Sequence, residues 1–152
     1  MVAVLRAVLQ RVDKARITVD GRLISSIGKG LLVFLGVEKG DGQEDAEYLL
    51  EKIINLRVFE DGKGKMNLSL LEESGEMLVV SQFTLLGNCR KGRRPSFTEA
   101  EEPQRAKMLY DFFITKGRER TRHTAGGEFQ AMMKIELINN GPVTIIIDSK
   151  KS

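Results

Sequence analysis

Residues 31–54, LLVFLGVEKGDGQEDAEYLLEKII, hold the two patterns that decide the class of fold. Residues 31–37 form a continuous apolar run of strand length, which predicts a strand buried on both faces. Asp41 is a suitable helix N-cap, with Glu44 three residues later as in a capping box. The apolar residues that follow recur at helical spacing and predict one buried stripe; they are Ala46, Leu49, Leu50, Ile53 and Ile54.

Two strand patterns precede this stretch. Residues 3–12 are rich in Val, Leu and Ala and contain no Gly or Pro, which predicts a strand. Residues 17–19 and 23–27 flank Asp20-Gly21. Because this pair supplies the positive φ angles of a tight turn, the segment predicts a β-hairpin.

A second strand and helix pattern follows in the middle of the chain. Residues 57–59 predict a short strand before a turn at Asp61-Gly62, and residues 77–81 predict another strand. Pro103 suits the first turn of a second helix, and Gly117 is expected to end it. The apolar residues between them again have helical spacing; they are Ala106, Leu109, Tyr110, Phe113 and Ile114.

The C-terminal part predicts two more strands. Residues 131–138 alternate between apolar and charged side chains, Gly141-Pro142 interrupts the pattern, and residues 143–147 form the last apolar run. About seven strands and two helices without regular alternation argue against a doubly wound parallel sheet. We expect residues 1–152 to form one α+β domain with a strongly curved, barrel-like, mostly antiparallel or mixed β-sheet and about two main helices.

Composition bounds the cellular setting. The single cysteine, Cys89, cannot form an internal disulfide, which fits a reducing compartment. The apolar N-terminal stretch is interrupted at Arg6 without a small-residue cleavage site, which argues against a signal peptide. The longest apolar run is far too short to span a membrane. We expect a cytoplasmic protein without a membrane partner.

Several common catalytic classes lack the residues that they need. A Ser-His-Asp or Cys-His arrangement would have to use His123, which lies in a polar stretch, and no G-x-S-x-G motif is present. One histidine and one cysteine cannot supply a zinc site of the usual type. We therefore expect no metal and no cofactor.

A Gly-rich basic loop lies after residues 77–81. It resembles a phosphate-binding P-loop, but Arg93 replaces the lysine, Arg94 replaces the hydroxyl residue and Pro95 opposes the helix that should follow. Two interpretations stay open for it: a solvated surface loop, or a loop that contacts phosphodiesters. The cations that would make such contacts are Arg90, Lys91, Arg93 and Arg94.

Two segments carry reactive or turn-forming residues in places that ordinary core sequence does not explain. Ser81-Gln82-Phe83-Thr84 offers two hydroxyls, an amide and a stacking surface where a strand opens into a loop. Residues 139–144, Asn-Asn-Gly-Pro-Val-Thr, suit a turn, and their Gly141-Pro142 bond is expected to be cis. Taken singly, each segment also fits a simple strand end or turn.

Together these segments resemble the two signature motifs of the D-aminoacyl-tRNA deacylase family. The resemblance covers nearly the whole chain, although Glu128 stands where a basic residue is expected and Asn140 where Asp is common. Further matching segments occur in the same order; they are residues 10–12, 30–33, 35–38, 64–68 and 90–97, with Phe129, Ala131 and Met133.

The resemblance implies an ester substrate, the aminoacyl group on the terminal ribose of tRNA. It assigns catalysis to Ser81, Gln82, Phe83 and Thr84, and in this family the threonine has been given either role, nucleophile or not. Because no residue near Thr84 in the sequence could deprotonate it, we favour water as the nucleophile. It assigns substrate binding and chiral selection to Gly141, Pro142, Asn139, Phe129, Met133 and Arg11.

The resemblance also implies a homodimer in which Gly141-Pro142 enters the partner's site and rejects L-aminoacyl groups, with some cleavage of glycyl-tRNA. Two other functions stay open on the sequence alone. One is a noncatalytic tRNA- or RNA-binding domain, and the other is a small Thr-dependent esterase for free small molecules.

Overall fold

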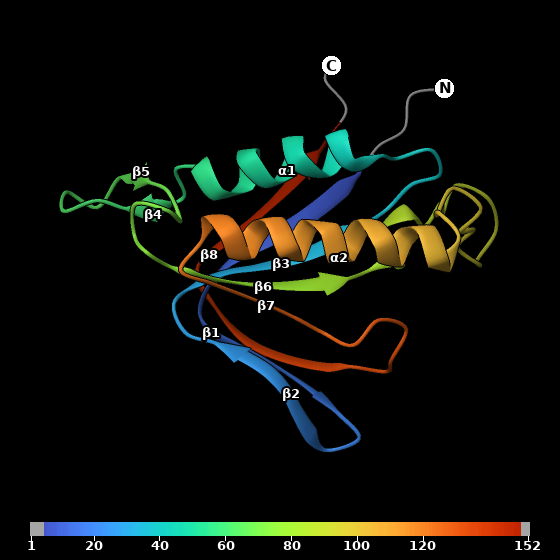
Figure 1. The fold of residues 1–152 in the computed structure, drawn as a ribbon, viewed down its shortest axis with the longest axis horizontal. Coiled ribbons are helices and arrows are strands. Elements are labelled where there is room, and N and C mark those ends of the chain that lie inside the picture. Colours follow the sequence, from blue (N-terminus) through green and yellow to red (C-terminus); the bar gives the residue numbers. More distant parts are fainter. Residues whose placement is uncertain (1–4, 150–152) are drawn as a thin grey trace.

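The computed structural model describes residues 5–149, so residues 3 and 4 of the expected first strand lie outside the described part. Six strands form one mixed sheet. In chain order they are β1 (Arg6–Val19), β2 (Arg22–Ile27), β3 (Gly30–Gly36), β6 (Glu76–Ser81), β7 (His123–Gly126) and β8 (Lys134–Asp148). The expected α+β class, the curved mixed sheet and the two main helices are all confirmed (Figure 1).

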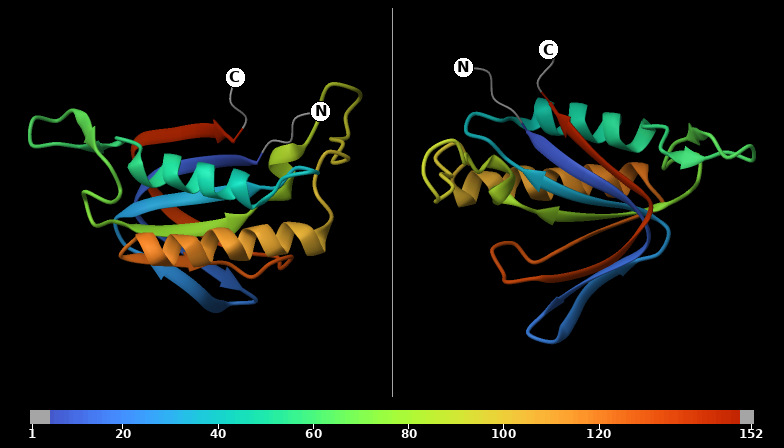
Figure 2. Two further views of the ribbon diagram at one scale, coloured as in Figure 1. Left: turned by 45° about the horizontal axis from the view of Figure 1, so that its top comes forward. Right: turned by 180° about the vertical axis from the view of Figure 1, so that it is seen from behind.

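The long strand β1 organises one half of the sheet. One edge of β1 pairs antiparallel with β3 and then with β2, and its other edge pairs with β8 along almost its whole length. β3, β6 and β7 continue the sheet as parallel neighbours. The sheet bends until β2 approaches β7, where Ser25 Oγ donates to the Gly126 carbonyl at 2.8 Å (Figure 2).

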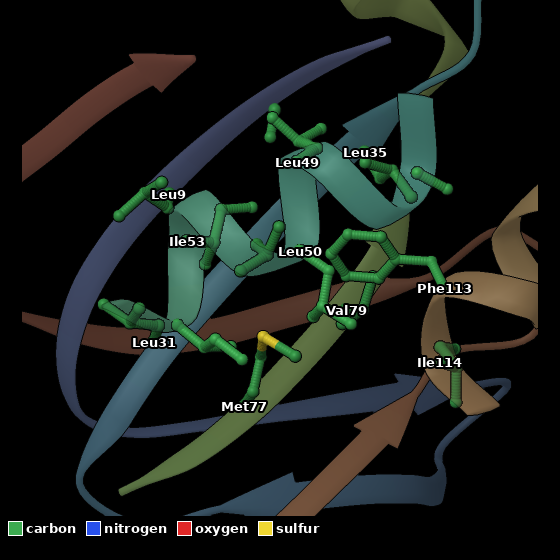
Figure 3. Close-up of a cluster of buried hydrophobic side chains, with 14 of the residues drawn as sticks. Leu9, Leu31, Leu35, Leu49, Leu50, Ile53, Met77, Val79, Phe113 and Ile114 are labelled. Atoms are coloured by element: carbon green, nitrogen blue, oxygen red, sulfur yellow. The ribbon is translucent and has the colours of Figure 1, made fainter. Parts of the chain in front are cut away.

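The two helices, α1 (Gln43–Asn55) and α2 (Pro103–Arg120), cover one face of this sheet (Figure 1). Their stripes pack on alternate residues of β3 and β6, such as Leu31 and Met77 (Figure 3). The other alternate residues, such as Leu32 and Leu78, form a second core inside the bend of the sheet. β3 is therefore buried on both faces, as predicted.

Two short strands and a 3-10 helix complete the described fold. β4 (Phe59–Glu60) and β5 (Met66–Leu68) form a separate two-stranded sheet, and η1 (Phe83–Leu86) follows β6. Within residues 5–149, no helix is long and apolar enough to span a membrane.

The start of α1 differs from the prediction. The N-cap is Gly42, and Asp45 accepts a hydrogen bond from the Gly42 N–H at 2.9 Å, so Asp41 and Glu44 do not form the expected capping box. Asp41 instead accepts from the Glu38 N–H at 2.6 Å in the buried turn before the helix. Burial raises the pKa of the Asp41 carboxyl to about 7, although the hydrogen bond from the Glu38 N–H acts in the opposite direction and lowers it.

The end of α2 also differs, because Gly117 lies inside the helix. A Cβ at Gly117 would stand 3.1 Å from both Met77 Cε and Thr124 Oγ1. The glycine thus lets α2 approach the sheet closely, and the helix continues to Arg120.

The sequence predicted two strands in the region of β8, but the structure has one continuous strand with a large bulge. Gln10 of β1 pairs with Thr144 and Val12 pairs with Asn139, so residues 140–143 stand opposite the single residue Arg11. A bulge accommodates Pro142, which has no N–H for the ladder. The interruption expected at Gly141-Pro142 therefore appears as a bulge inside a continuous strand.

Candidate active site

The end of β6 and the start of η1 form the first wall of a cleft. Ser81 ends β6, and the Gln82 N–H donates to the Leu35 carbonyl of β3 at 2.8 Å. A Cβ at Gly36 would lie 2.6 Å from Leu86 Cδ2 and 3.1 Å from the Gln82 carbonyl oxygen. Because Gly36 has no side chain, η1 packs directly against the end of β3.

The first turn of η1 presents hydrogen-bond donors. Phe83 and Thr84 open this helix, where N–H groups have no acceptor within the helix itself. The Gln82 side-chain amide donates to Thr84 Oγ1, and within residues 5–149 this is the one hydrogen bond of the Thr84 hydroxyl. An amide is not a base at neutral pH, so this contact orients the Thr84 hydroxyl without deprotonating it.

The cleft itself has a volume of about 590 Å³ and joins residues far apart in the chain. Ser81, Gln82 and Phe83 line one side, and Phe129 and Met133 line the other. Val80, Met133 and Ile135 also belong to the second core or pack against it. The cleft is thus the open end of the apolar interior, and it gathers five of the residues predicted for the site.

Tyr110 connects the two sides and was predicted only as part of a buried stripe. Its hydroxyl donates to the Val79 carbonyl at 2.7 Å and accepts from the Gly127 N–H at 2.9 Å. Burial raises the pKa of Tyr110 to about 12. A buried tyrosine needs partners for its hydroxyl, and this polar tip was the one signal that the sequence offered.

The basic loop is fixed at its base beside the cleft. Asn88 and Ser96 exchange two backbone hydrogen bonds of 2.7 and 2.8 Å, and the Phe97 ring meets the Phe83 ring edge-on at 5.2 Å. The loop projects beyond the N-terminal end of α2 (Figure 1). Its four cations are exposed and make no ion pair with any residue in the described range; they are Arg90, Lys91, Arg93 and Arg94.

The bulge of β8 is a second, separate group. Its Gly141-Pro142 bond is cis, as expected, and both residues are exposed. Buried Arg11 donates from Nε to the Asn140 carbonyl at 2.9 Å and from Nη1 to the Val58 carbonyl at 2.8 Å. Asn139 closes the bulge, because its Oδ1 accepts from the Val143 N–H at 2.9 Å.

The structure therefore places the predicted site residues in three groups. The cleft holds one group, with Thr84 at its edge in η1, and the basic loop lies beside it. Asn139, Gly141, Pro142 and Arg11 are not among the residues that line the cleft of their own chain. Among residues 5–149, no three His, Cys, Asp or Glu side chains gather in a way that could hold a metal ion.

Known proteins resemble this chain along nearly its full length. Residues 8–148 match the family model described as D-Tyr-tRNA(Tyr) deacylase. A D-aminoacyl-tRNA deacylase of Syntrophus aciditrophicus is 63% identical over 97% of this chain and 99% of that protein. A D-aminoacyl-tRNA deacylase of Aquifex aeolicus is 57% identical with the same coverage, 97% and 99%.

Solved structures agree with the fold. A protein described as c-Myc DNA Unwinding Element Binding Protein superposes with a TM-score of 0.91 at 41% identity, covering 96% of this chain and 99% of that chain. A probable eukaryotic D-amino acid tRNA deacylase superposes with a TM-score of 0.82 at 18% identity, covering 95% and 99%. The second likeness concerns the fold alone.

The bulge geometry generates a stability prediction for Arg11→Lys. A lysine cannot reach both backbone carbonyls, so at least one buried acceptor loses its charged partner. We expect the free energy of unfolding to fall by about 2–3 kcal/mol. Urea denaturation at one fixed protein concentration measures the change.

Arg16→Lys on the same strand is the matched control. Arg16 is exposed and pairs with Glu136 on the surface, so this substitution should lower the free energy of unfolding by less than about 1 kcal/mol. Equal losses in the two variants would mean that Arg11 does not hold the bulge.

Proposed function

The chain belongs to the D-Tyr-tRNA(Tyr) deacylase family, and from this premise we propose that it hydrolyses the ester that joins a D-amino acid to tRNA. The main support is the cleft, which combines an apolar wall, backbone donors at the start of η1 and an adjacent cationic loop. These are the features that an aminoacylated RNA end requires: a surface for a base, donors for an oxyanion and cations for phosphates.

The chemistry needs little more than positioning. An aminoacyl ester is already activated, so water can attack when the ester carbonyl is held and its developing charge is stabilised. The N–H groups of Phe83 and Thr84 stabilise the oxyanion, and the terminal ribose 2′-OH assists proton transfer. Thr84 stays an alcohol because its partner is the Gln82 amide. A trapped acyl group on Thr84, detected by mass spectrometry, would contradict attack by water.

Substrate is held from both sides of the cleft. Phe83 and Phe129 pack around the terminal adenosine, and Met133 contacts the same group from the side of the second core. The loop cations contact acceptor-stem phosphates, which gives affinity without reading the base sequence.

Chiral selection comes from a second copy of the chain. In the proposed homodimer, the exposed Gly141-Pro142 pair enters the partner's cleft, and its backbone carbonyls accept hydrogen bonds from the substrate's α-ammonium group. With the ammonium and the ester carbonyl both fixed, a D side chain points to solvent and an L side chain meets the motif. Glycine has no side chain to exclude, so glycyl-tRNA is cleaved to some extent.

Hydrolysis of paired substrates tests the proposal. We expect D-tyrosyl-tRNA to release its amino acid far faster than L-tyrosyl-tRNA, with glycyl-tRNA cleaved measurably and all rates unchanged by EDTA. Release of labelled amino acid gives the rates. Tight tRNA binding without turnover would favour a noncatalytic RNA-binding domain. Cleavage of simple esters without tRNA would favour a small esterase.

Gly141→Ala tests the motif that rejects L substrates. Gly141 has φ +137°, and a Cβ there would stand 2.8 Å from Val143 Cγ2 and 3.0 Å from Arg11 Nη2, so the bulge must shift. We expect the ratio of kcat/KM for D-tyrosyl-tRNA to that for L-tyrosyl-tRNA to fall by about 10- to 100-fold.

Gly64→Ala controls for backbone strain alone, because Gly64 has φ +76° and open space around its Cβ position. Its D-to-L ratio should stay at the wild-type value. A Gly141→Ala enzyme that also kept the wild-type ratio would remove the motif from chiral selection.

Reversal of two loop charges tests the phosphate contacts. Arg93→Glu with Arg94→Glu should weaken tRNA binding and reduce the slope of log K against log salt by about 1 for each lost contact. Filter binding over a salt series measures both. Lys63→Glu with Lys65→Glu makes the same charge change in the β4–β5 turn at the opposite end of the molecule (Figure 1). Equal slopes for the two double variants would mean that the loop is a solvated surface loop without phosphate contacts.

A further inference from the structure

Tyr110 contacts both segments that form the cleft, although it projects from α2. Val79, which accepts its hydrogen bond, lies two residues before Ser81 on β6. Gly127, which donates to it, lies two residues before Phe129. The Tyr110 ring also meets the Phe129 ring, with 6.0 Å between their centroids. One side chain therefore spans the distance between the two walls.

The backbone around Tyr110 is shaped to accept it. A Cβ at Gly126 would lie 2.8 Å from the Tyr110 hydroxyl oxygen and 2.5 Å from Ile114 Cδ1. A Cβ at Gly127 would lie 2.6 Å from Met133 Sδ. Two consecutive glycines thus let the chain between β7 and β8 pass close to the tyrosine and to the cleft at once.

The segment that Tyr110 holds makes few other hydrogen bonds to the rest of the chain, although Phe129 and Met133 pack against the two cores. Residues 127–133 contain no strand or helix, and Gln130 has a positive φ of 65°. Within the segment, the Ala131 N–H donates to the Glu128 carbonyl at 3.1 Å, which closes a turn without joining it to the sheet. The hydrogen bond from the Gly127 N–H to the Tyr110 hydroxyl joins this segment to α2. The same hydroxyl donates to Val79 and so connects the segment to β6 as well.

We propose that Tyr110 is a positioning residue that fixes the spacing between the Ser81–Phe83 wall and the Phe129–Met133 wall, and thereby orients the aminoacyl end of the substrate. This role rests on the proposed deacylase function of the cleft. Tyr110 does not line the cleft and touches no reacting atom. Its hydroxyl acts only through the two backbone groups that it joins.

Tyr110→Phe removes the hydroxyl and keeps the ring. The Val79 carbonyl and the Gly127 N–H lose their shared partner, while the contact with Phe129 remains. We expect kcat on D-tyrosyl-tRNA to fall by about tenfold or more because the bound ester is less well oriented. KM should change less than about threefold, since phosphate contacts outside the cleft supply much of the tRNA affinity.

Hydrogen exchange gives a readout that does not depend on activity. In the wild-type protein the Gly127 amide should exchange more slowly than the amides of residues 128–130. In Tyr110→Phe, exchange over residues 127–133 should accelerate while α1 keeps its protection. Tyr48→Phe, which removes the other tyrosine hydroxyl from α1, should leave kcat and this segment unchanged.

The outcomes separate the two proposals. A wild-type protein without activity on any aminoacyl-tRNA would overturn the proposed function, while slow Gly127 exchange would still support the anchor. A Tyr110→Phe enzyme with wild-type kcat would overturn the positioning role. If that variant does not fold, the wild-type measurement decides, because a Gly127 amide that exchanges as fast as its neighbours would exclude the anchor.

Discussion

Strands β3 and β6 are apolar on both faces, and the rest of the structure depends on covering both. Leu31 and Leu32, neighbours on β3, are each fully buried, but they belong to opposite cores. Two helices cover one face. No helix in the described chain covers the second face, so the sheet bends around its own apolar side chains until β2 reaches β7. The cleft lies at one end of this enclosed face, where Val80, Met133 and Ile135 line it.

The direction of the strands determines which residues reach this cleft. β3 and β6 are parallel, so their carboxyl ends meet at one edge, where Leu35 pairs with Ser81. Polar and catalytic groups commonly occupy such strand ends, because the chain leaves the sheet there and exposes backbone groups. Gly36 then admits η1 at close range, which brings the donors of its first turn beside an apolar wall. The proposed chemistry thus depends on packing as much as on the motif itself.

The sequence predicted the features that depend on neighbouring residues. The hairpin at Asp20-Gly21, the buried strand at residues 31–37 and the stripes of both helices needed only local patterns. The differences arise where a distant contact decides. Asp41 looked like an N-cap but is occupied by the Glu38 N–H, and Gly117 looked like a helix end but meets Met77 and Thr124. The bulge opposite Arg11 depends on a strand more than a hundred residues away, which no local pattern encodes.

The sequence predicted the residues of both motifs and also Arg11, but it gave Tyr110 only as part of a buried helical stripe. Arg11 and Tyr110 perform the same task by the same means. Each projects from a regular element, is buried, and binds two backbone groups on separate segments: the Asn140 and Val58 carbonyls for Arg11, the Val79 carbonyl and the Gly127 N–H for Tyr110. A bond to backbone fixes the path of the chain and leaves its side chains free to meet a ligand. Because the loss of a buried partner from such a bond is costly, each anchor stabilises the path of the backbone that it binds.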